Sequence, residues 1–317
     1  MIRHNQFSLN ALKLFVAGVI VSLLFFSHRI TLDSFFVLKE TWQWLLLAVC
    51  LMVPPCLIVS YRFMLILANQ NIKIPFFLAF RLTMIGYFFD LATPSSNGGD
   101  LIKAGYLMDY LGSGLKTRAA MTIVIDRLIG LLGLFFLSFI ASALSILFFI
   151  KLTAHNEIFI MTLLLVVIPL LFFRIVGSRR LINNKFIASS LDAFKWGRRI
   201  KQISNSFNLL TSSPKTLFLC MLLSLVNHLF WCSSILMITF AVGNNISILN
   251  GLEVFPLAIF GNIFGVGGGF GLGTAGFDLI LLKYLNIQNG VLIGILFQSM
   301  SAVTRLIGLP FYLRGIK

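Results

Sequence analysis

The chain has 317 residues, of which 58% are hydrophobic and 11% are charged, and its mean hydropathy is +0.97. Soluble domains contain roughly 45–50% apolar residues, so this composition excludes an ordinary soluble enzyme. The net charge of +15 would suit nucleic acid, but the excess is local, so we expect no nucleic-acid partner. The four cysteines and four histidines lack metal or disulfide spacing, and we expect no metal and no cofactor.

A membrane span needs about 20 mainly apolar residues. Six segments meet this length: 11–30, 42–62, 121–150, 156–173, 216–241 and 290–313. The first follows Arg3 and contains Lys13, as a signal peptide would, but it is as long as a span and no small-residue cleavage site follows. We therefore expect a retained helix. The sequence predicts an all-α, polytopic membrane helix bundle that forms a single domain over residues 1–317.

The segment 76–118 is apolar but interrupted by helix-breaking and charged residues. Its motif comprises Pro94, Asn97, Gly98, Gly99, Asp100 and Lys103. Pro94 ends one helix, and the Asn-Gly-Gly sequence permits the positive φ values of a tight reversal. Asp100 can cap the next helix, and Lys103 lies at i+3, where the two side chains can pair. The sequence predicts a broken hairpin whose second helix offers its N–H groups to an anion.

Charged residues inside a span cost roughly 2.5–3.5 kcal/mol each at the bilayer centre, so each requires a partner or water. Asp126 and Arg127 lie in the span 121–150, and Arg305 lies in the last span. Adjacent helical residues do not face each other, so we expect Asp126 and Arg127 to reach different neighbours. The two arginines suit a phosphate or carboxylate ligand, and equally a structural carboxylate such as Asp278.

The loop 174–215 contains nine basic residues against one acid, Asp192. The positive-inside rule places this loop in the cytoplasm. Its apolar residues recur mostly at three- to four-residue intervals: Ile187, Leu191, Phe194, Ile200, Ile203, Phe207 and Leu210. This pattern is typical of an interfacial amphipathic helix on anionic lipid, although a plain solvated loop explains the charge equally well.

The segment 252–285 is the second broken apolar region. It contains six glycines in nine positions: Gly265, Gly267, Gly268, Gly269, Gly271 and Gly273. We expect a reversal followed by a half-helix from about Thr274, with close packing of neighbouring helices as the alternative reason for the glycines. Glu253, at the start of the segment, is interpreted as interfacial.

The basic residues also constrain the topology. If both broken segments crossed fully while 174–215 stayed inside, the N-terminus, the loop after Arg62 and the C-terminus would all lie outside, against the charge rule. If both are re-entrant, every basic cluster is cytoplasmic and the two hairpins enter from opposite faces, as in an inverted repeat. A weak internal echo, with Ala104-Gly105-Tyr106 before Arg127 and Ala275-Gly276-Phe277 before Arg305, agrees with such a repeat.

At these residues the sequence resembles the lysylphosphatidylglycerol synthase transmembrane family, also described as flippase-like integral membrane proteins, over nearly the whole chain. The first family pattern stands as Pro94, Gly98-Gly99-Asp100 and Lys103, followed by Asp126-Arg127-Leu128-Ile129-Gly130. The second pattern, Pro-Gly-Gly-aliphatic-Gly-x-x-Glu, is met only in part. Gly267 replaces its proline and Thr274 replaces its glutamate.

The resemblance implies a bacterial inner-membrane domain that moves a lipid-linked or anionic amphiphile between leaflets, with anionic or glycosylated lipids as partners and both termini cytoplasmic. The aminoacyl-transfer domain of the large members is missing, and no catalytic constellation is found. The alternative is a membrane-embedded transferase or an accessory subunit of an envelope glycolipid pathway. The candidate site residues are Asn97, Gly98, Gly99, Asp100, Lys103, Asp126, Arg127, Gly268, Gly269, Gly271, Thr274, Asp278 and Arg305.

Overall fold

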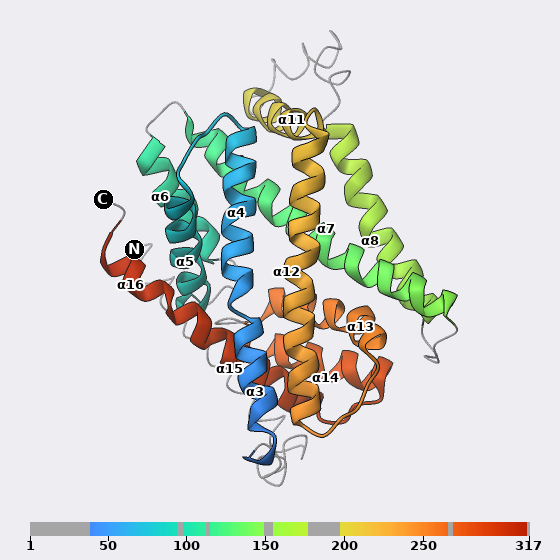
Figure 1. Ribbon diagram of the computed structural model, residues 1–317. Helices are drawn as coiled ribbons and strands as arrows, with labels where there is room; N and C mark the ends of the chain where they lie inside the picture. Colours follow the sequence, from blue (N-terminus) through green and yellow to red (C-terminus); the bar gives the residue numbers. More distant parts are fainter. Residues whose placement is uncertain are drawn as a thin grey trace, which may run out of the picture.

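The computed structural model describes residues 39–93, 98–111, 115–148, 155–176, 197–265 and 269–315, and its elements are helices (Figure 1). They are α3 (Trp42–Leu51), α4 (Pro54–Asn69), α5 (Phe76–Ala92), α6 (Gly98–Leu111), α7 (Lys116–Leu147), α8 (His155–Val176), α11 (Gly197–Thr211), α12 (Pro214–Ala241), α13 (Ile248–Gly261), the 3₁₀ turn η2 (Asn262–Phe264), α14 (Leu272–Leu285), α15 (Gly290–Leu306) and α16 (Gly308–Leu313). The all-α prediction is confirmed for these residues.

Five helical segments are long and apolar enough to cross a membrane: Trp42–Asn69, Lys116–Leu147, His155–Ile175, Pro214–Ala241 and Gly290–Leu313. They confirm five of the six predicted spans. The remaining one, 11–30, lies outside the described residues. The chain is therefore a multi-pass membrane protein, in which α3 with α4 and α15 with α16 each form one span interrupted by a helix break.

The first predicted hairpin is formed by α5 and α6, whose backbones touch. A Cβ built on Gly99 would lie 1.9 Å from the Gly86 carbonyl oxygen, and one on Gly98 would lie 2.0 Å from the Thr93 hydroxyl. Gly98 and Gly99 are the first residues of α6, and neither has a positive φ. The prediction that they supply positive φ values is therefore wrong. They are needed because no side chain fits between the two helices.

The second predicted hairpin consists of α13, η2 and α14. Gly269 and Gly271 have φ values of 117° and 79°, which side-chain-bearing residues rarely adopt, and α14 begins at Leu272. The prediction that a helix starts near Thr274 is confirmed. Close packing contributes as well, because a Cβ on Gly273 would lie 2.5 Å from Asn262 Oδ1.

The two hairpins lie at different levels of the bundle. In Figure 1, α5 and α6 are level with the N-terminal half of α12, which begins at Pro214. Helices α13 and α14 are level with its C-terminal half, which ends at Ala241. The α15–α16 span runs obliquely past both hairpins and packs against α14 and α5. Gly308 permits this contact, since a Cβ there would lie 2.0 Å from the Met84 carbonyl oxygen.

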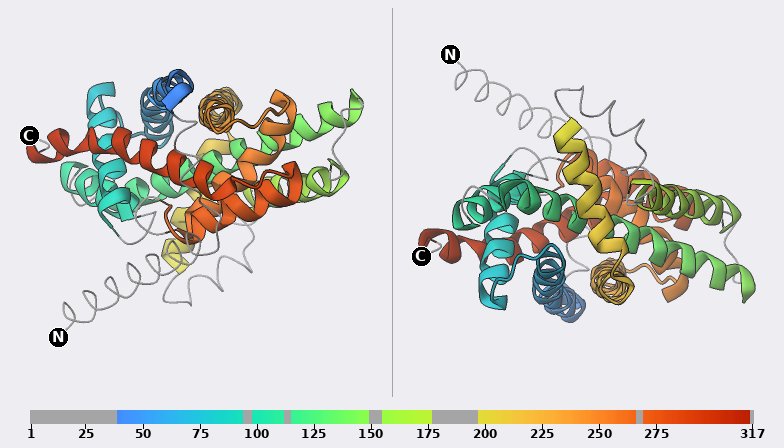
Figure 2. Two further views of the ribbon diagram at one scale, coloured as in Figure 1. Left: turned by 90° about the horizontal axis from the view of Figure 1, so that it is seen from below. Right: turned by 90° about the horizontal axis from the view of Figure 1, so that it is seen from above.

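Helix α11 lies across the end of the bundle near the start of α12 (Figure 2). Phe207 and Leu210 are 2% and 0% exposed, and the Phe207 ring lies 5.1 Å from that of Phe173 on α8. A helix is present in the described part of the predicted stretch, Gly197–Thr211, but at these two residues its apolar face covers protein instead of lipid. Of the other predicted positions, Ile187, Leu191 and Phe194 lie outside the described residues.

Candidate functional site

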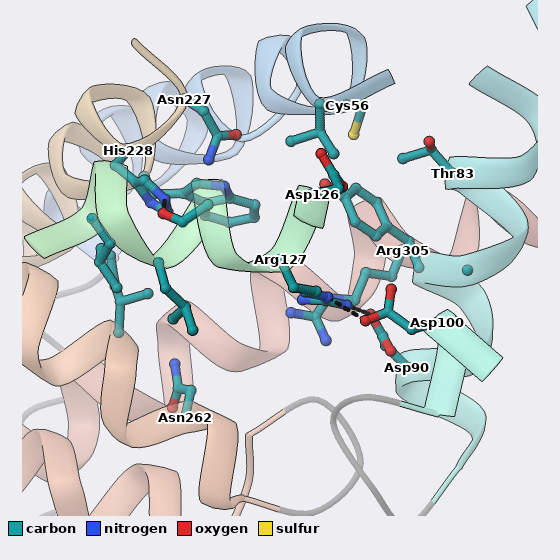
Figure 3. Close-up of a pocket in the computed structure, with 18 of the residues that line it drawn as sticks. Cys56, Thr83, Asp90, Asp100, Asp126, Arg127, Asn227, His228, Asn262 and Arg305 are labelled. Atoms are coloured by element: carbon teal, nitrogen blue, oxygen red, sulfur yellow. Dashed lines mark hydrogen bonds and ion pairs between the residues drawn. The ribbon is translucent and has the colours of Figure 1, made fainter. Parts of the chain in front are cut away.

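A cavity of about 390 Å³ lies among α4, α5, α6, α7, α12, α13, η2 and α15 (Figure 3). This volume lies within the range of small-molecule sites, roughly 300–1,000 Å³. Five of the predicted site residues line it: Asp100, Lys103, Asp126, Arg127 and Arg305. The structure therefore brings charges from the first hairpin, the α7 span and the last span to one place.

Arg127 fastens the first hairpin to α7. Its guanidinium forms an ion pair with Asp100 on α6 and lies 3.5 Å from Asp90 Oδ2 on α5. The other oxygen of Asp90 accepts a 2.9 Å hydrogen bond from the Gly99 amide. Asp90 therefore occupies the role at the start of α6 that the sequence assigned to Asp100, and the Gly99 N–H predicted to be bare is already bonded to a carboxylate.

Asp126 pairs with Arg62 and not with its neighbour Arg127. Arg62 Nε donates to Asp126 Oδ1 at 2.8 Å, and Nη1 donates to the Ser224 hydroxyl at 2.6 Å. The two side chains are only 5% and 8% exposed. The expectation that Asp126 and Arg127 reach different neighbours is confirmed, and Asp126 forms part of a connection between α4, α7 and α12.

Sequence reasoning missed Arg62. It placed this residue at the start of a cytoplasmic loop, whereas α4 continues to Asn69. The apolar residues on both sides of Arg62, through Ile66 and Leu67, were the signal that the helix does not end there.

Within the described residues, Lys103 and Arg305 are the two cavity cations with no carboxylate oxygen within the 4.0 Å of an ion pair. The Lys103 side chain is buried, and its Nζ lies 3.4 Å from the centroid of the Phe63 ring. This arrangement is a cation–π contact. The expected pairing of Lys103 with Asp100 does not form, because Asp100 binds Arg127. Arg305 lies in the last turn of α15 and faces the same cavity, without pairing with Asp278.

The predicted residues of the second hairpin that the structure describes do not line the cavity. Thr274 is fully buried and donates to Gln298 Oε1 at 2.7 Å. Gln298 Nε2 in turn donates to Asn262 Oδ1 at 3.0 Å and to the Gly269 carbonyl at 2.9 Å. Thr274 thus helps to hold the glycine reversal. Gln298, which sequence reasoning missed, is the centre of this network.

The other predicted residues of this hairpin fall outside the cavity or outside the described residues. Gly271, with its positive φ, belongs to the reversal, and Asp278 is buried on α14 against Gly290. Gly268 and, in the first hairpin, Asn97 lie outside the described residues. Asn262 is the residue through which the second hairpin contributes a polar side chain to the cavity.

Glu253 forms a second buried pair, remote from the cavity. Its side chain is 0% exposed, and its two carboxylate oxygens lie 3.0 and 2.8 Å from His155 Nδ1 at the start of α8. The interpretation of Glu253 as interfacial is wrong. The nearest acid in the sequence to His155 is Glu157, so sequence proximity pointed away from this pair.

Helix α12 supplies a neutral wall of the cavity through Asn227, His228 and Trp231. His228 Nε2 donates to the Gly130 carbonyl at 2.9 Å, and Trp231 packs edge-on against Phe297. The Asn227 side chain is 4% exposed and its oxygen has no hydrogen-bond partner in the described part of the chain. Figure 3 shows Asn227 and His228 across the cavity from Asp90 and Asp100.

The described residues contain no group of three or more His, Cys, Asp or Glu side chains placed to hold a metal ion. The cavity offers four basic side chains, two of which form no close ion pair among the described residues, three aspartates, and a neutral wall that can form hydrogen bonds. Such a set can hold an anionic group by charge-assisted hydrogen bonds.

Residues 10–308 match the model of the family described as lysylphosphatidylglycerol synthase TM region. The matched range includes both broken hairpins and every residue that lines the cavity. No curated protein matches the chain.

Proposed function

We propose that this chain, which belongs to the lysylphosphatidylglycerol synthase transmembrane family, is a lipid transporter that moves an anionic or lipid-linked amphiphile across the bacterial inner membrane. The observation that carries the proposal is the cavity among the spans, where Lys103 and Arg305 form no close ion pair with a carboxylate of the described residues. Unpaired charges at membrane depth are costly, so such a cavity suits water and an anionic head group.

The lengths of the hairpin helices support re-entrant hairpins. Helices α6, α13 and α14 have 14 residues each, and α5 has 17. A span needs about 20 residues, so these helices suit segments that enter the membrane and return on the same side. In this proposal the two hairpins enter from opposite faces as an inverted repeat, and both chain termini are cytoplasmic. The distribution of Lys and Arg supports this topology.

In this proposal the head group occupies the cavity while the acyl or prenyl chains stay in lipid. Arg127, Lys103 and Arg305 hold the anion, and the protein contributes no covalent chemistry. The exposed apolar side chains of the spans suit contact with lipid tails. Net movement then requires that the cavity open to each leaflet in turn.

The test is leaflet exchange of fluorescent lipids in vesicles that contain the purified protein. We expect exchange of anionic lipids faster than in protein-free vesicles, and a large reduction with Arg305→Met. The matched control is Lys283→Met, since Lys283 pairs with Glu157 on the surface, where both side chains are more than 60% exposed. Exchange no faster than in empty vesicles, across anionic and glycosylated lipids, would sink the proposal. A chemically altered lipid would instead favour a membrane-embedded transferase.

A further inference from the structure

The charges on the cavity wall do not cancel. Four basic residues face three acidic ones: Arg62, Lys103, Arg127 and Arg305 against Asp90, Asp100 and Asp126. With His228 neutral, the described part of the wall therefore carries one positive charge in excess. The hairpin residues outside the described ranges, 94–97 and 266–268, contain no charged side chain. Because an uncompensated charge is costly away from water, the occupant that best balances this wall is a monoanion.

The acidic residues of the wall are already bonded to arginine. Asp126 accepts from Arg62, whereas Asp90 and Asp100 both pair with Arg127. An ammonium group on a ligand would be matched best by a free carboxylate, and to reach one here it would have to displace an arginine. Thr274, which stands at the position of the family's glutamate, lies outside the cavity and is bonded to Gln298.

The α12 wall offers neutral hydrogen bonding instead. The Asn227 amide is buried and its oxygen lacks a partner in the described residues, at a cost of about 1–3 kcal/mol that a bound ligand can offset. An amide both donates and accepts, and so does a hydroxyl group. Trp231, one turn further along α12, adds a flat apolar surface beside it.

We propose that the cavity takes a phosphodiester head group of single negative charge whose alcohol is uncharged and hydroxylated, as in a polyol or a sugar, and that it discriminates against head groups bearing an ammonium. The phosphate lies near Lys103 and Arg305, and the hydroxyl groups meet Asn227. This inference rests on the proposed function and specifies the substrate class of the same cavity.

The test is binding of three soluble glycerophosphodiesters to the purified full-length protein in detergent, measured by calorimetric titration. They are glycerophosphoinositol, glycerophosphoglycerol and glycerophosphoethanolamine, which share the phosphodiester and differ in the alcohol. We expect the first two to bind about tenfold more tightly than the third, as one or two added hydrogen bonds and a better charge balance would give. Equal affinities, preference for the ethanolamine compound, or no binding of any of the three would overturn the inference.

Two variants of Asn227 test the assignment of the α12 wall. Asn227→Asp cancels the excess charge and adds a carboxylate, so the preference for the inositol compound should fall about tenfold. Asn227→Leu should weaken the binding of the two hydroxylated compounds and leave that of the ethanolamine compound unchanged. The control is Ser234→Ala, because Ser234 is also a buried α12 residue with an unbonded oxygen but does not line the cavity. An unchanged preference in Asn227→Asp would overturn the inference.

The same three head groups on fluorescent lipids separate this inference from transport itself. If the protein exchanges all three lipids at one rate, the head-group preference is overturned and transport stands. If it exchanges none, transport is overturned, whereas the preference is still decided by the titration.

Discussion

Arg62 and Asp126 form a buried ion pair that joins α4 to α7 and, through Ser224, to α12. Removing one partner of such a pair leaves an uncompensated charge, which costs about 3–5 kcal/mol. We expect Arg62→Met to lower the free energy of unfolding by about this amount. Thermal or denaturant unfolding in detergent measures the change.

The double variant Arg62→Met with Asp126→Leu is the matched control for this prediction. Because no charge is left unpaired, it should recover most of the stability lost in the single variant. Additive losses in the double variant would show that the pair is not the reason for the destabilisation.

Gly99 and Gly105 of α6 give a second residue-scale prediction. A Cβ on Gly99 would overlap the Gly86 carbonyl at 1.9 Å, whereas one on Gly105 meets nothing within 4 Å. We expect Gly99→Ala to destabilise the protein by about 1–3 kcal/mol or more, since α5 and α6 must move apart. Gly105→Ala should be neutral or slightly stabilising, because alanine favours the helix. Equal effects on the melting temperature would refute the close approach.

At the residue scale, the sequence identified the charged residues of the site more reliably than the residues with which they pair. The cost of a charge in lipid depends on the local sequence, so Arg127 and Arg305 stood out. Their partners depend on tertiary contacts between distant helices: Arg127 reaches Asp90, 37 residues away in sequence. Arg62 was missed because its residue type also suits the end of a span.

At the element scale, the sequence predicted the spans and the breaks well. A run of about 20 apolar residues identifies a span without any long-range information, and the glycine run marked the reversal at Gly269 and Gly271. The reason for each glycine could not be predicted in the same way. A glycine can be required for a positive φ value or for close packing, and the second depends on which residue lies opposite; Gly86 lies opposite Gly99.

The proposed re-entrant topology predicts which helix ends share a side of the membrane. Lys73 and Asp109 lie near the two ends of the first hairpin, Asn245 and Gln288 near those of the second, and all four are exposed. Single cysteines at Lys73 and Asp109 should react with an impermeant reagent from one side, and those at Asn245 and Gln288 from the other. The background must first lose the native thiols Cys50, Cys56, Cys220 and Cys232. Labelling of Lys73→Cys and Asp109→Cys from opposite sides would exclude a re-entrant first hairpin.

At the scale of the whole molecule, the cavity exists only because segments far apart in the sequence meet. Its wall takes residues from Cys56 to Arg305, and no local pattern encodes that meeting. The sequence contributed the idea of paired hairpins around a site. It did not predict that Thr274 and Asp278 lie away from the cavity, or that α12 supplies its neutral wall.

Arg127 and Arg305, two of the three arginines that line the cavity, should differ when they are replaced. Arg305 has no ion pair in the described residues, so Arg305→Ala should reduce lipid exchange while the melting temperature is nearly unchanged. Arg127 holds both Asp90 and Asp100, so Arg127→Ala should reduce exchange and also destabilise the protein by about 1–3 kcal/mol. Parallel measurement of exchange and unfolding distinguishes the two cases. Equal destabilisation by both variants would assign Arg305 a structural role.

Helix α8 lies at the periphery of the bundle in Figure 1, and little of its surface is buried within the protein. Ile160, Leu164, Ile168 and Leu171 are all more than half exposed. A side chain that meets only fluid hydrocarbon must be apolar but need not have any particular shape. Over evolutionary time these positions should therefore exchange freely among leucine, isoleucine, valine and phenylalanine, whereas Phe173, against Phe207, should vary little.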